Sequence, residues 1–162
     1  MRINPANVKA YHKLSKANIG LGELADASMN LSKALEFEPD NETNKKELKL
    51  LNDLRITEKV IYKNVEEKKF DKAVINLDEL LKKCKHSINH ICLKVECLLK
   101  SYQVSAAKKH SRSVMKESSE FADHPRLLFW RGKVLYYAGD EEQALKNFRQ
   151  ALNYDPDFSE CQ

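Results

Sequence analysis

The feature of this sequence that most constrains its fold is one spacing of small and apolar residues that occurs near both ends. From Gly132 the steps are twelve residues to Ala144, four to Phe148, three to Ala151 and five to Pro156. The same steps connect a second set of residues, which are Ser15, Ala27, Leu31, Ala34 and Pro39. A glycine stands seven residues after each starting position, at Gly22 and Gly139, where a tight turn between two helices requires positive φ. The sequence therefore predicts two copies of one helix–turn–helix unit.

Two less regular copies follow the same steps in the middle of the chain. They run through Ile61, Ala73, Leu77, Leu80 and Lys85, and through Val95, Ala107, Ser111, Val114 and Ser119. Both copies lack the proline, and a larger aliphatic residue replaces the first small one. The four predicted repeats span approximately residues 8–41, 54–87, 88–121 and 125–158, with the helix of the second extended from residue 42.

The alternation of small and large residues has a simple physical reason. Small residues mark the places where two helices approach closely, and larger ones fill the space between them. The larger residues assigned to this role are Leu14, Leu31, Leu128, Leu135, Tyr136 and Phe148. Because one helix pair cannot cover its own apolar stripe, we expect successive pairs to stack around one continuous core.

The interval between the first and second copies is longer than the others. Ala27 and Ala73 are 46 residues apart, whereas Ala73 and Ala107 are 34 apart. The intervening segment contains neither Gly nor Pro, so we expect one long helix over residues 42–68 that joins two clusters of repeats rigidly. All the predicted helices are 6–20, 24–37, 42–68, 70–83, 88–101, 104–118, 125–138 and 140–153. Asp40 or Asn41 and Asp140 are expected to cap the helices that they precede.

Composition and charge agree with an all-α protein and exclude several functions. The chain has only 4 Gly and 4 Pro, and its 28 basic and 24 acidic residues alternate in sign along the predicted helices. This alternation indicates solvated faces, so we do not expect nucleic-acid binding. No apolar run approaches the roughly 20 residues that cross a bilayer, so we expect no membrane association. The four cysteines, Cys84, Cys92, Cys97 and Cys161, form no disulfide or metal motif and are expected to be reduced thiols of a cytoplasmic protein.

Residues suited to catalysis, cofactor binding or metal binding are not grouped in this sequence. His86, His90 and Cys92 could share one helix face and suggest zinc, but polar capping at a repeat junction explains the histidines better. No Ser or Cys stands in a motif that would activate it, and four glycines cannot build a phosphate-binding loop. We expect no catalytic residues, no metal and no cofactor.

In residue type and spacing, the four copies resemble the tetratricopeptide repeat over essentially the whole chain. This resemblance implies an α-solenoid, a right-handed superhelix of antiparallel helix pairs, with a concave groove lined by the first helix of each repeat. The groove would bind an extended peptide or a helix. The residues expected to line it are Tyr62, Glu96, Lys100, Trp130, Lys133 and Tyr137. For Trp130, packing in the core is the alternative.

The first repeat resembles the third repeat of the carboxylate-clamp domains, which bind the acidic C-terminal tails of Hsp70 and Hsp90. Lys9 and Lys13 stand at the two cationic positions of that repeat, four residues apart on one helix face, and Lys16 is a third partner-binding candidate on the same helix. Lys13 replaces an arginine, and the clamp residues of two preceding repeats are not in this chain. The resemblance therefore implies half of a clamp.

The order of a clamp-type repeat, a long helix and then the remaining repeats resembles the J-domain co-chaperones with many tetratricopeptide repeats. This implies a non-catalytic scaffold that binds Hsp70, Hsp90 or unfolded client polypeptide. The HPD tripeptide of a J domain does not occur in the chain, and the "DPDFSECQ" ending predicts a fragment of a longer protein. A structural adaptor in a complex unrelated to chaperones is the alternative function, and a weak homodimer through the terminal helices is a further possibility.

Overall fold

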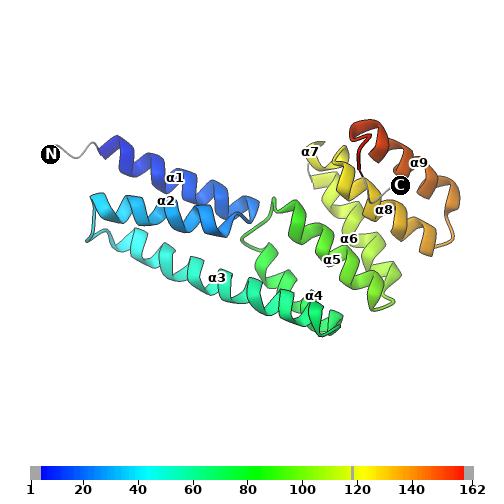
Figure 1. Ribbon diagram of the computed structural model, residues 1–162, viewed down its shortest axis with the longest axis horizontal. Helices are drawn as coiled ribbons and strands as arrows, with labels where there is room; N and C mark the ends of the chain where they lie inside the picture. The colour runs from blue at the N-terminus through cyan, green and yellow to red at the C-terminus, as the bar shows by residue number, and fades with distance from the viewer. Residues whose placement is uncertain (1–4, 118, 159–162) are drawn as a thin grey trace. The chain divides into compact units, whose positions relative to one another are not determined.

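The computed structural model describes residues 5–117 and 119–158. Those residues form helices and no strand (Figure 1). The helices are α1 (Pro5–Leu21), α2 (Leu24–Phe37), α3 (Glu42–Glu66), α4 (Phe70–Leu81), α5 (Ile88–Lys100), α6 (Val104–Glu117), α7 (Ser119–Ala122), α8 (Pro125–Tyr137) and α9 (Glu141–Tyr154). The all-α prediction is confirmed. Cys161, which is expected to be a reduced thiol, lies outside the described residues.

The chain divides into two compact units. The first unit takes in the residues up to Glu67 together with Ile75–Ser87. The second takes in Lys68–Val74 and the residues from Ile88 onward. Within the described residues, no helix is long and apolar enough to cross a membrane.

Several helices begin at capping residues or at a proline, which can be identified in the sequence. Asn41 caps α3, because its side chain accepts a hydrogen bond from the Asn44 backbone N–H at 3.1 Å. Asp140 caps α9 through the Gln143 backbone N–H at 3.3 Å. Pro125 opens α8, where its missing N–H costs no hydrogen bond. The short helix α7 was not predicted.

The turn between the two helices of each predicted repeat has the same backbone conformation in all four copies. Gly22 and Gly139 have φ of 77° and 80°, as their sequence positions predict. Lys68 and Tyr102 stand at the corresponding positions, seven residues after Ile61 and Val95, and have φ of 57° and 59°. The sequence predicts a helix break at each of these two places but not the positive φ, because the residues that adopt it are not glycines. The shared conformation supports the register assigned to the two irregular copies.

Positive φ at Lys68 predicts a stabilising substitution. A non-glycine residue with positive φ destabilises the fold by about 1–2 kcal/mol. Glycine removes this strain, but its greater freedom in the unfolded chain offsets about 0.5–1 kcal/mol of the gain. Lys68→Gly should therefore raise the free energy of unfolding by about 0.5–1 kcal/mol in a denaturant titration. Gly139→Ala is the reverse test, because no atom lies within 4 Å of the added Cβ and only backbone strain would change. A stabilised Gly139→Ala variant would be incompatible with this turn conformation.

The core of the first unit contains the residues of the regular spacing. Helices α1 and α2 run antiparallel side by side, and α2 packs on α3 (Figure 1). The buried positions include Ser15, Ala27, Leu31, Ala34, Leu51 and Ile61. The prediction for Leu14 is wrong: its side chain is 51% exposed. Since neighbouring helical residues are about 100° apart, the close approach at Ser15 turns Leu14 away from α2.

The core of the second unit has its closest helix contact between α8 and α9. Gly132 of α8 faces the ring of Phe148, and Ala144 and Ala151 of α9 are buried. Val95, Ala107, Ser111 and Val114 are buried in α5 and α6, as the spacing predicts, and so are Leu128 and Leu135 of α8. The prediction that Tyr136 packs in the core is wrong, because its side chain is 59% exposed and lies edge-on to Tyr137.

Candidate peptide-binding groove

A hollow of about 380 Å³ lies within the second unit. Its lining combines aromatic, aliphatic and charged side chains, which are Phe70, Glu96, Leu99, Lys100, Tyr102, Val104, Trp130, Lys133 and Tyr137. We call this hollow the groove. Five of the nine residues predicted to bind a partner line it: Glu96, Lys100, Trp130, Lys133 and Tyr137.

The repeat register explains why these residues meet. Glu96 and Lys133 each stand one residue after the start of the spacing in their repeats. Lys100 and Tyr137 each stand five residues after it. Corresponding positions on the first helices of successive repeats line the same side of a stacked solenoid. Residues of α5 and α8 that are far apart in sequence therefore share one surface.

The charges in the groove are two lysines and one glutamate. Lys100 forms an ion pair with Glu96 at 2.5 Å, and its Nζ lies 5.4 Å from the centre of the Phe70 ring. Lys133 Nζ lies 4.9 Å from the centre of the Trp130 ring and 5.1 Å from that of Phe129. These positions suit cation–π attraction. Lys133 has no carboxylate partner among the described residues, so its ammonium group is available to a ligand.

Trp130 combines the two roles that the sequence left open. Its side chain lines the groove, but only 9% of the residue is exposed, so most of the ring is core. The ring packs edge-on against Phe129 at 5.5 Å between centres. Its Nε1–H is buried without an acceptor among the described residues. A ligand would therefore contact the edge of a fixed aromatic ring.

Four lining residues were not predicted: Phe70, Leu99, Tyr102 and Val104. Leu99 could have been predicted to line the groove, because it stands three residues after Glu96 on the same helix face. Tyr102 reaches the groove from its positive-φ turn, and this conformation was not predictable from a tyrosine. The predicted Tyr62 is not a lining residue; it is exposed on α3 in the first unit.

The predicted cations of α1 lie at a second hollow, of about 320 Å³, within the first unit. Lys9 and Lys13 both line it, together with Val8, His12, Glu38, Asn41, Thr43 and Asn44. Lys16 lies apart from them, because its Nζ pairs with Glu47 of α3 at 3.3 Å. Tyr11 stacks on Phe37 of α2 at 6.2 Å between ring centres. The structure thus brings together two of the three α1 cations.

The described cysteines Cys84, Cys92 and Cys97 are buried. Burial raises the pKa of Cys84 to about 11, with a further contribution from the charge of Glu58. Burial likewise raises the pKa of Cys97 to about 11, where Glu96 adds to the effect and Lys100 opposes it. Among the described residues, no group of three or more His, Cys, Asp or Glu side chains could hold a metal ion.

Comparison with known families gives the class of the protein. One family model described as tetratricopeptide repeat matches residues 8–41, and another with the same description matches residues 125–158. With the helix pairs described above, these matches show that the chain contains tetratricopeptide repeats at residues 8–41 and 125–158. Such repeats form a family of protein-interaction scaffolds without catalytic chemistry of their own.

Several curated proteins to which the chain is similar are DnaJ proteins. The chain is 28% identical over 161 residues to DnaJ homolog subfamily C member 7 of Homo sapiens, covering 99% of this chain and 32% of that protein. It is 27% identical over 153 residues to DnaJ homolog subfamily C member 7 homolog of Dictyostelium discoideum, covering 94% of this chain and 28% of that protein. The chain thus spans about a third of the length of these curated relatives.

A solved structure shows the same fold. The crystal structure of the P58(IPK) TPR domain matches with a TM-score of 0.79 and 20% sequence identity. The match covers 95% of this chain and 43% of that one. The predicted tetratricopeptide architecture is confirmed.

Proposed function

We propose that this chain is the peptide-binding scaffold of a cytoplasmic DnaJ-type co-chaperone, and that it holds chaperone or client polypeptide in the groove. The observation that carries the proposal is the groove's combination of a fixed aromatic edge at Trp130 with an available ammonium group at Lys133. The similarity to DnaJ proteins supports the co-chaperone setting.

The chemistry of the groove suits an extended polypeptide. Trp130, Tyr137, Tyr102 and Phe70 offer apolar surface for one or two anchoring side chains. Lys133 can pair with a carboxylate of the ligand, while Lys100 is already partly neutralised by Glu96. We therefore expect preference for a segment with an apolar residue close to an acidic one. Such mixed recognition fits exposed segments of unfolded proteins.

The hollow on α1 is proposed as a second contact, for an acidic C-terminal tail. Lys9 and Lys13 both line it, and two cations on one helix face suit a terminal carboxylate and a neighbouring side-chain carboxylate. Lysine lacks the bidentate geometry of arginine, so this contact would be weaker than that of a complete clamp. Lys16 is expected to contribute less to binding of the tail, because its ammonium group already forms an ion pair with Glu47.

The groove can be tested by fluorescence, because Trp130 is the only tryptophan of the chain. Titration with an extended client peptide that carries an aromatic and an acidic residue should shift the Trp130 emission and saturate. Lys133→Glu should weaken this binding about tenfold, since it replaces attraction by repulsion at the groove. Lys82→Glu, at an exposed position of the first unit, is the control of equal charge change and should leave the affinity unchanged.

Peptides that copy Hsp70 or Hsp90 tails form the second arm of this experiment. Their binding should weaken when Lys9 and Lys13 are both changed to alanine, and Lys133→Glu should have little effect. Equal loss of client binding in Lys133→Glu and Lys82→Glu would refute the groove. Capture of partners that include neither chaperones nor unfolded protein would favour an adaptor in another complex.

A further inference from the structure

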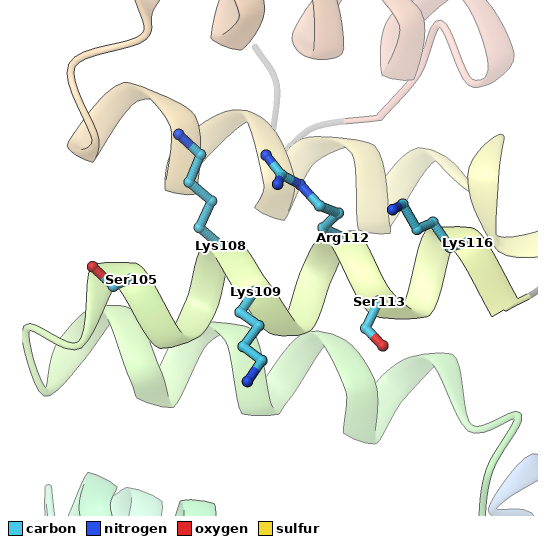
Figure 2. A pocket seen from close by; sticks show the side chains of 6 residues that line it. All are labelled: Ser105, Lys108, Lys109, Arg112, Ser113 and Lys116. Atoms are coloured by element: carbon cyan, nitrogen blue, oxygen red, sulfur yellow. The ribbon is translucent and has the colours of Figure 1, made fainter.

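The outer face of α6 is an unusual charged surface of the second unit, separate from the groove. Six residues line a hollow of about 590 Å³ on this helix: Ser105, Lys108, Lys109, Arg112, Ser113 and Lys116. We call them the α6 basic face. Figure 2 shows Lys108, Arg112 and Lys116 projecting along one side of the helix and Lys109 from the other. The opposite side of α6 is buried through Ala107, Ser111 and Val114.

The four cations of this face are not neutralised by any side chain that the structure describes. None of them has an acidic partner among the described residues. The reason lies in the sequence: positions three and four residues before each cation hold Val, Ser, Ala or another cation. Lysines on other helices do have such partners, as Lys45 has Glu42 and Lys82 has Glu79.

Repulsion between cations extends from α6 to α8. Arg131 lies against α6, with Nη1 2.9 Å from the sulfur of Met115. The pKa of Arg131 is lowered, first by burial and then by the positive charge of Arg112. An anion bound beside Arg112 would relieve this repulsion. The packing of α6 on α8 therefore keeps the positive charges of Arg112 and Arg131 close enough to repel each other.

We propose that the α6 basic face binds an acidic polypeptide segment, independently of the groove. Lys108, Arg112 and Lys116 are spaced by one helical turn, or about 6 Å per step. Alternate side chains of an extended strand are about 6.6–7 Å apart on one side, so successive carboxylates of an acidic segment match the cations in register. Ser105 adds a hydroxyl group for the peptide backbone, whereas the Ser113 hydroxyl already donates to the Glu117 carboxylate at 3.0 Å.

The chemistry of the face favours a polypeptide over other polyanions. Its lining has no aromatic side chain on which a nucleic-acid base could stack. It also has no exposed apolar side chain to enter a bilayer. The stripe of cations from Lys108 to Lys116 is about 12 Å long, which suits about four residues of an extended peptide. A short run of glutamates or aspartates is the ligand of matching size and charge.

The test is fluorescence anisotropy of a labelled glutamate–serine repeat peptide with the whole chain. The peptide should bind, and its affinity should fall as salt is raised. Arg112→Glu with Lys116→Glu should weaken binding about tenfold or more. The matched control is Lys146→Glu with Arg149→Glu, which makes the same charge change on exposed positions of α9 and should leave the affinity within about threefold.

Further arms separate the alternatives. Loss of peptide binding in Lys133→Glu, with binding kept in the Arg112→Glu and Lys116→Glu double variant, would place the site in the groove and overturn the proposal. Circular dichroism of each variant confirms that helix content is kept. Equal losses in the α6 and α9 variants would mean that net charge alone attracts the peptide. Tighter binding of single-stranded RNA or phosphatidylserine vesicles than of the peptide would likewise overturn the proposal.

Discussion

Leu31→Ala is expected to lower the free energy of unfolding by about 2–5 kcal/mol. Leu31 is fully buried at the third position of the first repeat's spacing, between Ala27 and Ala34. Removing its branched end would leave a cavity among α1, α2 and α3, because the small neighbours cannot extend into the space. The measurement is thermal and urea unfolding followed by circular dichroism at a helix band.

Leu14→Ala is the matched control for this substitution. It removes the same atoms from a leucine of α1 that is 51% exposed, so it should change the stability by less than about 0.5 kcal/mol. The large difference between the two leucines is the expected outcome. Similar melting temperatures for the two variants would mean that the helix faces are assigned wrongly.

Gly132→Ala is expected to destabilise the second unit by about 1–3 kcal/mol, although alanine is the better helix former. A Cβ added at Gly132 would lie 2.5, 2.7 and 2.9 Å from three ring atoms of Phe148. The ring cannot move without cost, because it packs against Phe129 at 5.9 Å between centres. Phe129 in turn contacts Trp130, so the substitution should also alter the tryptophan emission.

Gly20→Ala tests the same chemical change without the clash. Gly20 also lies in a helix, but the nearest atom to its added Cβ is a His86 ring carbon at an ordinary 3.8 Å. This variant should therefore gain up to about 1 kcal/mol from helix propensity. Combining Gly132→Ala with Phe148→Leu should recover part of the loss, which a double-mutant cycle would measure. Stabilisation by Gly132→Ala alone would contradict the close contact of α8 with α9.

The positions of the helices were predictable because their signals are local. Asn41 and Asp140 cap helices through contacts that span three residues, and Gly22 and Gly139 end helices through their own backbone freedom. The four-residue helix α7 lacks both a periodic apolar stripe and a glycine stop. It could not be separated from a loop by such signals.

Burial of individual side chains was less predictable, since it depends on neighbouring helices. Tyr136 and Ile19 occupy the same step of their repeats, yet Ile19 is buried and Tyr136 is mostly exposed. What packs beyond the helix pair decides the difference, and the residue itself does not reveal it. The register did bring Glu96, Lys100, Trp130, Lys133 and Tyr137 to one groove.

The charge on α6 illustrates a different limit of sequence reasoning. Counted over the chain, 28 basic and 24 acidic residues indicate mixed, solvated faces. Helical geometry places Lys108, Arg112 and Lys116 on one side of α6, with no acidic partner among the described residues, and an average over the chain conceals this. Local charge has to be counted by helix face.

Backbone-amide chemical-shift mapping by NMR, with an extended client peptide added to the isotope-labelled chain, tests the groove most directly. Binding at the groove should shift the amides of Glu96–Lys100 and Trp130–Tyr137 most strongly, and Lys133→Glu should reduce these shifts at a peptide concentration below saturation. Strong shifts confined to α9, with the groove residues unchanged during saturable binding, would contradict a peptide-binding groove on α5 and α8.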